Sequence, residues 1–369
     1  MPVKNNTNQP LLVGLGEALF DRFPDRCILG GAPLNLAVHA NALLQRAGGG
    51  STIVTRVGND ELGDQLIEHL KSKGLSHAFI QYDSKYSTGV VDVSLDDEGH
   101  AEYSIKENAA WDHLRFETTL AKLAANCRAV CFGTLAQRHP ATRAAIYGFL
   151  DAAPQAIRFL DVNLRKPHYS AAILDQSLNR ATVAKLNEHE LPLVCGILGL
   201  KTPTNDAPGE LAQVMIQAFG LDLLALTRGA LGTVIYRDGK RVEGSPVQLN
   251  RSPGADSVGA GDACSAALVT GLLLGLADQQ IADMANRIGA YVAGMPGATP
   301  DLPEELLDEA VLVRGDARRR AQHDSARHRI CGSSASRHDR VARSYAWVAP
   351  PGVLWRRHVP RDCRRSRRQ

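Results

Sequence analysis

Strand-like and helix-like segments alternate along most of this sequence, and this alternation limits the folds open to it. Apolar or β-branched runs at residues 11–15 and 51–57 are each followed by a segment with helical apolar spacing, at 33–47 and 61–73. A helix after each strand returns the chain to the start of the next strand, so that neighbouring strands run parallel and helices cover both faces. The sequence therefore predicts an α/β fold with a mostly parallel central sheet.

Two pairs of strands interrupt this alternation. Residues 88–95 and 100–105 alternate polar and apolar side chains around an acidic, glycine-containing turn, which is typical of an antiparallel hairpin inserted as a small lid. A second hairpin is expected at 232–236 and 240–242. The remaining predicted elements are strands at 128–132, 158–162 and 223–227, and helices at 141–152, 171–180, 263–276, 281–293 and 304–313.

The formal net charge of +3 conceals a sharp division near residue 313. Residues 314–369 contain 16 arginines, no lysine and four aspartates, a net charge of +12, whereas the preceding residues carry −9. Clustered arginine suits an arm that binds nucleic acid, but this stretch contains no recognisable module to position it. We expect one folded domain over residues 11–313, a disordered tail or shifted reading frame over 314–369, and no nucleic-acid partner.

Composition and cysteine spacing exclude further classes. The chain is 44% hydrophobic and 22% charged, which is typical of a globular protein. No apolar run approaches the roughly 20 residues that span a bilayer. The seven cysteines are scattered without the paired spacing of a metal site. We expect a cytoplasmic protein with no membrane partner.

A glycine-rich stretch, DSVGAGDA at residues 256–263, precedes a long apolar segment. Small residues let the backbone approach a ligand, and unpaired N–H groups at a helix N-terminus favour a phosphate. Asp262 belongs to this turn, where its carboxylate would lie beside a bound phosphoryl group and accept the proton of an attacking hydroxyl. The alternative is an aspartate that only stabilises the helix dipole.

Residues 30–35, GGAPLN, open an earlier helix after a similar pair of glycines. Asn35 lies one turn into that helix, where its amide can point back toward a ligand over the turn. The alternative is an ordinary helix start with a buried asparagine.

Together these two segments resemble the two signature motifs of the ribokinase-like, PfkB-type carbohydrate kinases. Order and spacing agree over residues 11–313, and the sequence is most similar to fructokinases within that family. The further matching stretches are GEALFD at 16–21, RVGNDELG at 56–63, DVNLR at 161–165, NEHE at 187–190 and TRGALG at 227–232.

The resemblance implies a role for each matching residue. By the resemblance, Asp262 would be the catalytic base, and the backbone of Gly259, Ala260 and Gly261 would stabilise the phosphoryl group in transfer. Asp21, Gly31 and Asn35 would hold the sugar, with Arg165 as a cation over the substrate or the transferring phosphate. The residues that would hold the nucleotide and its Mg²⁺ are Asn187, Glu190 (through water), Thr227, Gly229 and Asn286, and Asp256 would hold a K⁺ ion. The lid is expected from residues 17–29 and 86–106.

Most of these residues also have a structural alternative. Asn187 and Glu190 suit an ordinary cap pair before a helix. Asp21 suits a surface turn, Arg165 a surface salt bridge, and Asn286 a packed or solvent-facing helical side chain.

The resemblance implies ATP-dependent transfer of the γ-phosphoryl group to a primary hydroxyl of a free sugar, with fructose giving fructose 6-phosphate. Ribose, 2-keto-3-deoxygluconate or a nucleoside are alternative substrates, and a non-catalytic sugar-binding regulatory protein is an alternative of another class. A dinucleotide oxidoreductase is disfavoured because Leu19 stands where its fingerprint requires a third glycine. A P-loop kinase fails because the chain has no Gly-Lys-Ser or Gly-Lys-Thr. The expected partners are the sugar, ATP, Mg²⁺ and K⁺, and a second copy of the chain through the lid.

Overall fold

The computed structural model describes residues 11–23, 26–95, 101–201 and 207–308. Backbone contacts divide the chain into two units, residues 1–321 and 322–369, and all of the described residues belong to the first. The arginine-rich tail and the end of the helix expected at 304–313 lie outside the described residues. The domain boundary at residue 313 therefore stays a prediction.

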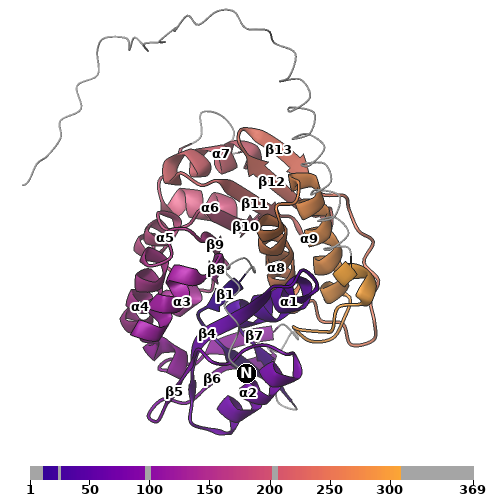
Figure 1. Cartoon of the computed structure of the whole chain (residues 1–369). Coiled ribbons are helices and arrows are strands. Elements are labelled where there is room, and N and C mark those ends of the chain that lie inside the picture. Colours follow the sequence, from indigo (N-terminus) through magenta and orange to yellow (C-terminus); the bar gives the residue numbers. More distant parts are fainter. Residues whose placement is uncertain (1–10, 24–25, 96–100, 202–206, 309–369) are drawn as a thin grey trace, which may run out of the picture. The chain divides into compact units, whose positions relative to one another are not determined.

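Within the described residues, nine strands form one large sheet in the order β13-β12-β11-β10-β9-β8-β1-β4-β5. Every neighbouring pair from β5 to β11 is parallel, and β12 and β13 add an antiparallel edge. The bounds are β1 (Leu11–Leu15), β4 (Gly50–Gly58), β5 (Ile80–Asp83), β8 (Ala129–Phe132), β9 (Ile157–Asp161), β10 (Val183–Asn187), β11 (Leu223–Thr227), β12 (Thr233–Arg237) and β13 (Lys240–Glu243). The predicted α/β fold with a mostly parallel sheet is confirmed (Figure 1).

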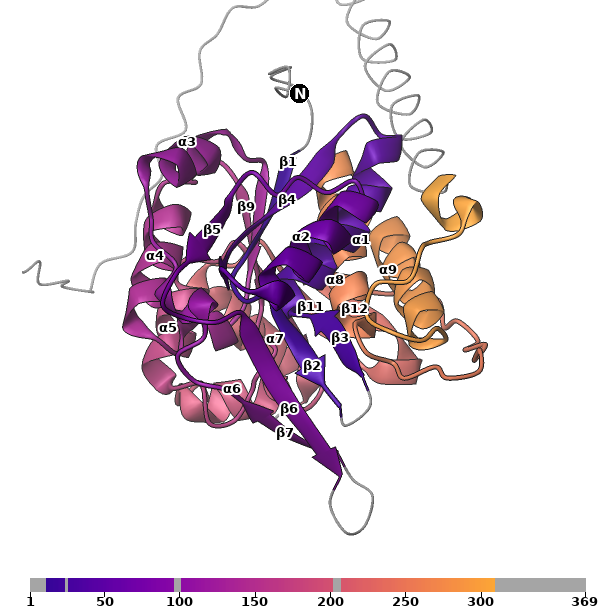
Figure 2. The ribbon, with the colours of Figure 1, turned by 90° about the horizontal axis from the view of Figure 1, so that it is seen from below.

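Helices cover both faces of this sheet, as Figure 2 shows. One face carries α1 (Ala32–Arg46), α8 (Ala260–Leu274) and α9 (Asp278–Ala293). The other carries α3 (Thr118–Asn126), α4 (Pro140–Asp151), α5 (Ala171–Leu178), α6 (Glu190–Ile197) and α7 (Pro208–Phe219). Successive strand residues enter opposite cores: Leu12 packs with α8 and α9, and Val13 with the helices of the other face. Because both faces are buried, the strands are almost continuously apolar.

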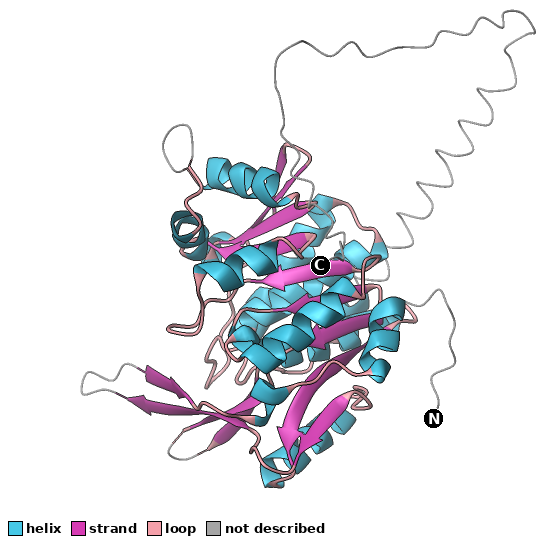
Figure 3. Ribbon diagram, turned by 90° about the vertical axis from the view of Figure 1, so that its left-hand side faces the viewer, coloured by secondary structure: helices cyan, strands magenta, loops and turns pink. Residues whose placement is uncertain are grey.

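A second, four-stranded sheet forms the small lid, in the order β3-β2-β6-β7. Its strands are β2 (Leu19–Arg22), β3 (Cys27–Gly30), β6 (Gly89–Leu95) and β7 (Ala101–Ile105). β6 and β7 make the predicted antiparallel hairpin, and β2 joins β6 in parallel. Figure 3 shows this sheet beside the large one, and α2 (Glu61–Ser72) packs against β4 in a separate apolar cluster.

One predicted boundary near the candidate site is wrong. The helix expected at 263–276 is α8, which begins at Ala260 and therefore contains Asp262 in its first turn. In the described part of the chain, no helix is both long and apolar enough to cross a membrane.

Candidate active site

The glycine-rich turn forms the N-terminus of α8. Gly259 is the N-cap, with φ 76° and ψ −5°, a left-handed conformation that side chains disfavour. A Cβ on this residue would also lie 2.4 Å from the carbonyl oxygen of Ala298. The Ala260 amide donates a hydrogen bond of 3.4 Å to the Ser257 carbonyl. The amides of Gly261 and Asp262 belong to the first turn, where the helix itself provides no carbonyl acceptor four residues earlier. The turn therefore presents backbone N–H groups and a helix dipole that suit a phosphoryl group.

Asp262 contacts the second sequence motif directly. The side-chain amide of Asn35 donates a hydrogen bond of 2.8 Å to Oδ2 of Asp262, across 227 residues of sequence. Burial and the negative charge of Asp161 raise the pKa of Asp262 to about 6, against the lowering effects of Asn35, Lys185 and Arg165. The carboxylate is thus ionised at neutral pH, yet more basic than an ordinary aspartate.

The predicted sugar residues converge from the lid and from the start of α1. Gly31 caps α1 with φ 111°, and a Cβ there would meet the carbonyl oxygen of Glu17 at 2.7 Å. Asp21 lies on lid strand β2, half-buried, and burial raises its pKa while the charge of Arg165 opposes that rise. The exposed Arg165 also interacts electrostatically with Asp262. One cation thus acts on both a lid carboxylate and the candidate base.

Glu17 is a site residue to which the sequence analysis gave no role. It follows β1, is 4% exposed, and one of its carboxylate oxygens, Oε2, has no hydrogen-bond partner. Burial is the main cause that raises its pKa to about 7, and the charge of Asp262 adds to the rise while Arg165 opposes it. A glutamate inside the largely apolar stretch GEALF was the available signal, because charged residues are rarely buried without a purpose.

Asn187 and Glu190 form a reciprocal network at the end of β10. The Asn187 side chain accepts hydrogen bonds of 2.9 Å from the amides of His189 and Glu190. The Glu190 carboxylate accepts from the amides of Asn187 at 2.9 Å and Leu164 at 2.8 Å, one at each oxygen. This is the predicted cap pair, and the Leu164 amide extends it to the loop that follows β9. Each carboxylate oxygen keeps a further lone pair, so Glu190 also fits a water-mediated contact to Mg²⁺.

In the residues that the structure describes, no three histidine, cysteine, aspartate or glutamate side chains converge to hold a metal. Mg²⁺ characteristically keeps several waters and binds substrate phosphates. The side chains present therefore suit an ion that is carried mainly by phosphate oxygens and water.

The other predicted nucleotide residues lie at the end of β11 and on α9. Thr227 is the last residue of β11, and Gly229 follows with φ 53° and open space around the position of a Cβ. Asn286 is 8% exposed, and both ends of its amide are engaged: it accepts from the Thr233 amide at 2.8 Å and donates to the Ser245 carbonyl at 2.9 Å. Asn286 thus positions neighbouring backbone segments, and its predicted contact with the nucleotide stays a prediction.

Asp256 ties the loop before α8 to the loop after α9. Its carboxylate accepts from the amides of Val258 at 3.1 Å and Gly297 at 3.2 Å. The same two loops meet at Gly259 and Ala298. Asp256 therefore holds the loop pair behind the phosphate-binding turn, and a K⁺ ion there stays a prediction.

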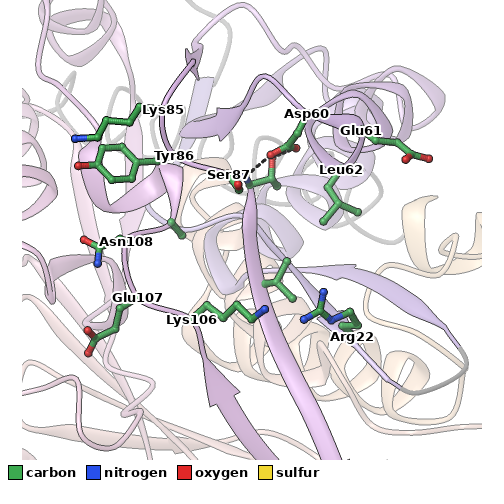
Figure 4. A pocket seen from close by; sticks show the side chains of 13 residues that line it. Arg22, Asp60, Glu61, Leu62, Lys85, Tyr86, Ser87, Lys106, Glu107 and Asn108 are labelled. Carbon is green, nitrogen blue, oxygen red and sulfur yellow. Dashed lines mark hydrogen bonds between the residues drawn. The ribbon is translucent and has the colours of Figure 1, made fainter.

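A cavity of about 520 Å³ lies beside the lid and away from these residues (Figure 4). Its lining includes Arg22, Val90 and Lys106 from the lid. Arg22 follows Asp21 directly along β2, so the two side chains point to opposite faces of the lid sheet. None of the predicted site residues lines it. This cavity is consequently distinct from the candidate active site.

Comparison with known proteins agrees with this geometry. Residues 25–305 match the model of the pfkB family carbohydrate kinases. A fructokinase of Escherichia coli is 30% identical over 315 residues, covering 80% of this chain and 97% of that protein. Among solved structures, fructokinase with bound ATP from Xylella fastidiosa has a TM-score of 0.69 at 22% identity, covering 84% of this chain and 99% of that one. A 2-dehydro-3-deoxygluconokinase from Thermotoga maritima also has a TM-score of 0.69, at 17% identity, covering 81% and 98%.

The α/β sheet with its small β lid, the carboxylate in the first turn of α8, and the match to carbohydrate kinases together define the class, an ATP-dependent phosphotransferase. Over most of its length, the chain belongs to the pfkB family of carbohydrate kinases. The predicted family and enzyme class are therefore confirmed.

Proposed function

We propose that this kinase transfers the γ-phosphoryl group of ATP to the primary hydroxyl of fructose, giving fructose 6-phosphate. The observation that carries the proposal is the hydrogen bond of 2.8 Å between Asn35 and Asp262. It joins the motif expected to hold the sugar to the turn expected to hold the phosphate. A hydroxyl bound near Asn35 would consequently lie next to both the base and the phosphoryl group.

Asp262 acts as the general base. As the hydroxyl oxygen attacks the γ-phosphorus, its proton passes to the Asp262 carboxylate, an O–P bond forms, and the bond to the leaving oxygen of ADP breaks. A pKa of about 6 suits this task, because the carboxylate is ionised at pH 7 and still readily accepts a proton. The first-turn amides of Gly261 and Asp262 stabilise the charge on the transferring group.

The nucleotide side rests on Asn187, Glu190, Thr227 and Gly229, which lie at the ends of neighbouring strands β10 and β11. In the parallel part of a sheet, these carboxyl ends are where ligands bind. Mg²⁺, when bound, would neutralise phosphate charge, and Glu190 would hold its hydration water. A K⁺ ion beside Asp256 would lie in the loop before α8 and add positive charge next to the phosphate-binding turn.

The charges around Arg165 favour a neutral sugar over an acidic one. Arg165 interacts with three carboxyl groups, those of Asp21, Glu17 and Asp262. The negative charge of 2-keto-3-deoxygluconate would compete with them for this one cation, whereas the hydroxyls of fructose would not. Closure of the lid over the sugar would exclude water and limit hydrolysis of ATP.

A coupled assay of ADP release tests the function, with fructose, ribose, 2-keto-3-deoxygluconate and adenosine compared at equal Mg²⁺ and K⁺. We expect kcat/KM to be highest for fructose, and turnover to be lost in Asp262→Asn. A higher kcat/KM for another acceptor would identify that acceptor, rather than fructose, as the preferred substrate. Full activity of Asp262→Asn would remove the proposed base.

The remaining expectations concern partners. A homodimer through the lid is consistent with β3 and β7, whose outer edges are unpaired within the described small sheet. Light scattering of the purified chain tests this. Deletion of residues 314–369 tests the tail, and we expect kcat with fructose to be unchanged.

A further inference from the structure

A buried ion pair lies directly behind the phosphate-binding turn. Lys185 on β10 and Asp161 at the end of β9 are paired neighbours in the parallel sheet. The Lys185 Nζ lies 3.0 Å from each carboxylate oxygen of Asp161, and the two side chains are only 8% and 7% exposed. Charges so deeply buried are costly to desolvate, and an apolar pair of similar volume is often at least as stable.

The ion pair is connected to α8. The Ser265 hydroxyl donates a hydrogen bond of 2.7 Å to Asp161 and lies 3.0 Å from the carbonyl oxygen of Gly261. A Cβ built on Gly261 would lie 3.6 Å from the Lys185 Nζ. Figure 1 shows α8 beside the strands that carry the pair. The lysine ammonium is thus adjacent to the turn that presents its amides to the phosphoryl group.

We propose that Lys185 and Asp161 are positioning residues for phosphoryl transfer. They hold the turn at Gly261 through Ser265, and Lys185 places a buried positive charge behind the transferring group. This inference rests on the proposed function of the turn. Positive charge that is fixed in place before reaction stabilises the transition state without the cost of reorganising water.

The same pair acts on the base in two opposite senses. The charge of Asp161 raises the pKa of Asp262, and the charge of Lys185 lowers it. The other charged groups that act on Asp262 are Arg165, which lowers its pKa, and Glu17, whose own pKa is raised by the charge of Asp262. Lys185 itself also faces Glu190 and the thiol of Cys264. Removing one member of the pair therefore leaves an uncompensated charge of known sign near the base.

The test is the pH dependence of kcat with fructose and ATP in Lys185→Met, Asp161→Asn and the double variant. In Lys185→Met, we expect kcat to fall about ten- to hundredfold, with KM for fructose little changed. The acidic limb of the pH profile, where kcat falls because the base becomes protonated, should move to higher pH. In Asp161→Asn, we expect the limb to move to lower pH. The double variant, which has lost both charges, should return the limb toward that of the unaltered enzyme.

Arg138→Met is the matched control, because Arg138 and Asp112 form another buried pair, 8% and 2% exposed, with a contact of 2.7 Å. We expect it to lower stability and leave the acidic limb in place. If Lys185→Met does not fold, two results still test the inference. The acidic limb should move to lower pH in Asp161→Asn, and it should move back in the double variant. Limbs that shift in the same direction, or not at all, would overturn the inference. An unaltered enzyme that phosphorylates no sugar would instead refute the proposed function.

Discussion

Asp262→Asn should make the protein more stable while it removes nearly all turnover. The pKa of this carboxyl is raised from 3.8 to about 6, mainly by burial and by the charge of Asp161. A shift of about two pH units at 1.36 kcal/mol each corresponds to about 3 kcal/mol against the ionised form in the folded state. The amide of an asparagine carries no charge, and its oxygen can still accept the hydrogen bond from Asn35.

The sign of the effect follows from linkage. A carboxyl whose folded pKa is raised destabilises the fold only where it is ionised, so the penalty is absent well below pH 3.8 and complete above about pH 6. The gain in the free energy of unfolding should therefore be about 3 kcal/mol at pH 8 and below about 1 kcal/mol at pH 4. Loss of the base should lower kcat by roughly 10² to 10⁴.

Urea unfolding at both pH values, together with kcat for fructose, measures these effects. Asp238→Asn is the control, since this exposed aspartate lies in the turn between β12 and β13 with φ 50°, which asparagine tolerates. We expect no change in stability or kcat for it. The electrostatic reasoning would be refuted if Asp262→Asn were less stable than the unaltered protein at pH 8. It would also be refuted if the free energy of unfolding changed by the same amount at both pH values.

Three further predictions concern the same region. Gly259→Ala should cost about 1–3 kcal/mol of stability and lower kcat sharply, because its φ of 76° and the nearby carbonyl exclude a Cβ; urea unfolding and turnover check this. Glu190→Gln should cost about 1–3 kcal/mol, since one partly buried amide loses its acceptor, and should raise the Mg²⁺ concentration for half-maximal rate. Asn286→Ala should raise KM for ATP and leave KM for fructose unchanged, because two backbone groups near β12 and β13 lose their partner; initial rates at varied ATP decide it.

The sequence alone predicted those elements whose pattern is local. The helical spacing at 33–47 and 61–73 corresponds to α1 and α2, and the alternation at 88–95 corresponds to β6, within one or two residues. β5 and β10 were missed because β5 is short and polar and β10 carries Lys185 in its centre, which breaks an apolar run. The glycines before Asp262 masked the start of α8, because glycine in a sequence indicates a turn even where it caps a helix.

Motif spacing likewise determined which residues were candidates for the site, but it could not show which of them touch. The hydrogen bond between Asn35 and Asp262 joins residues 227 positions apart, and only the packing of α1 beside α8 brings it about. The burial of Glu17, and of Lys185 with Asp161, likewise depends on neighbouring strands and helices. Local chemistry sets what a side chain can do, whereas its charge and basicity depend on groups that are distant in the chain and adjacent only in the fold.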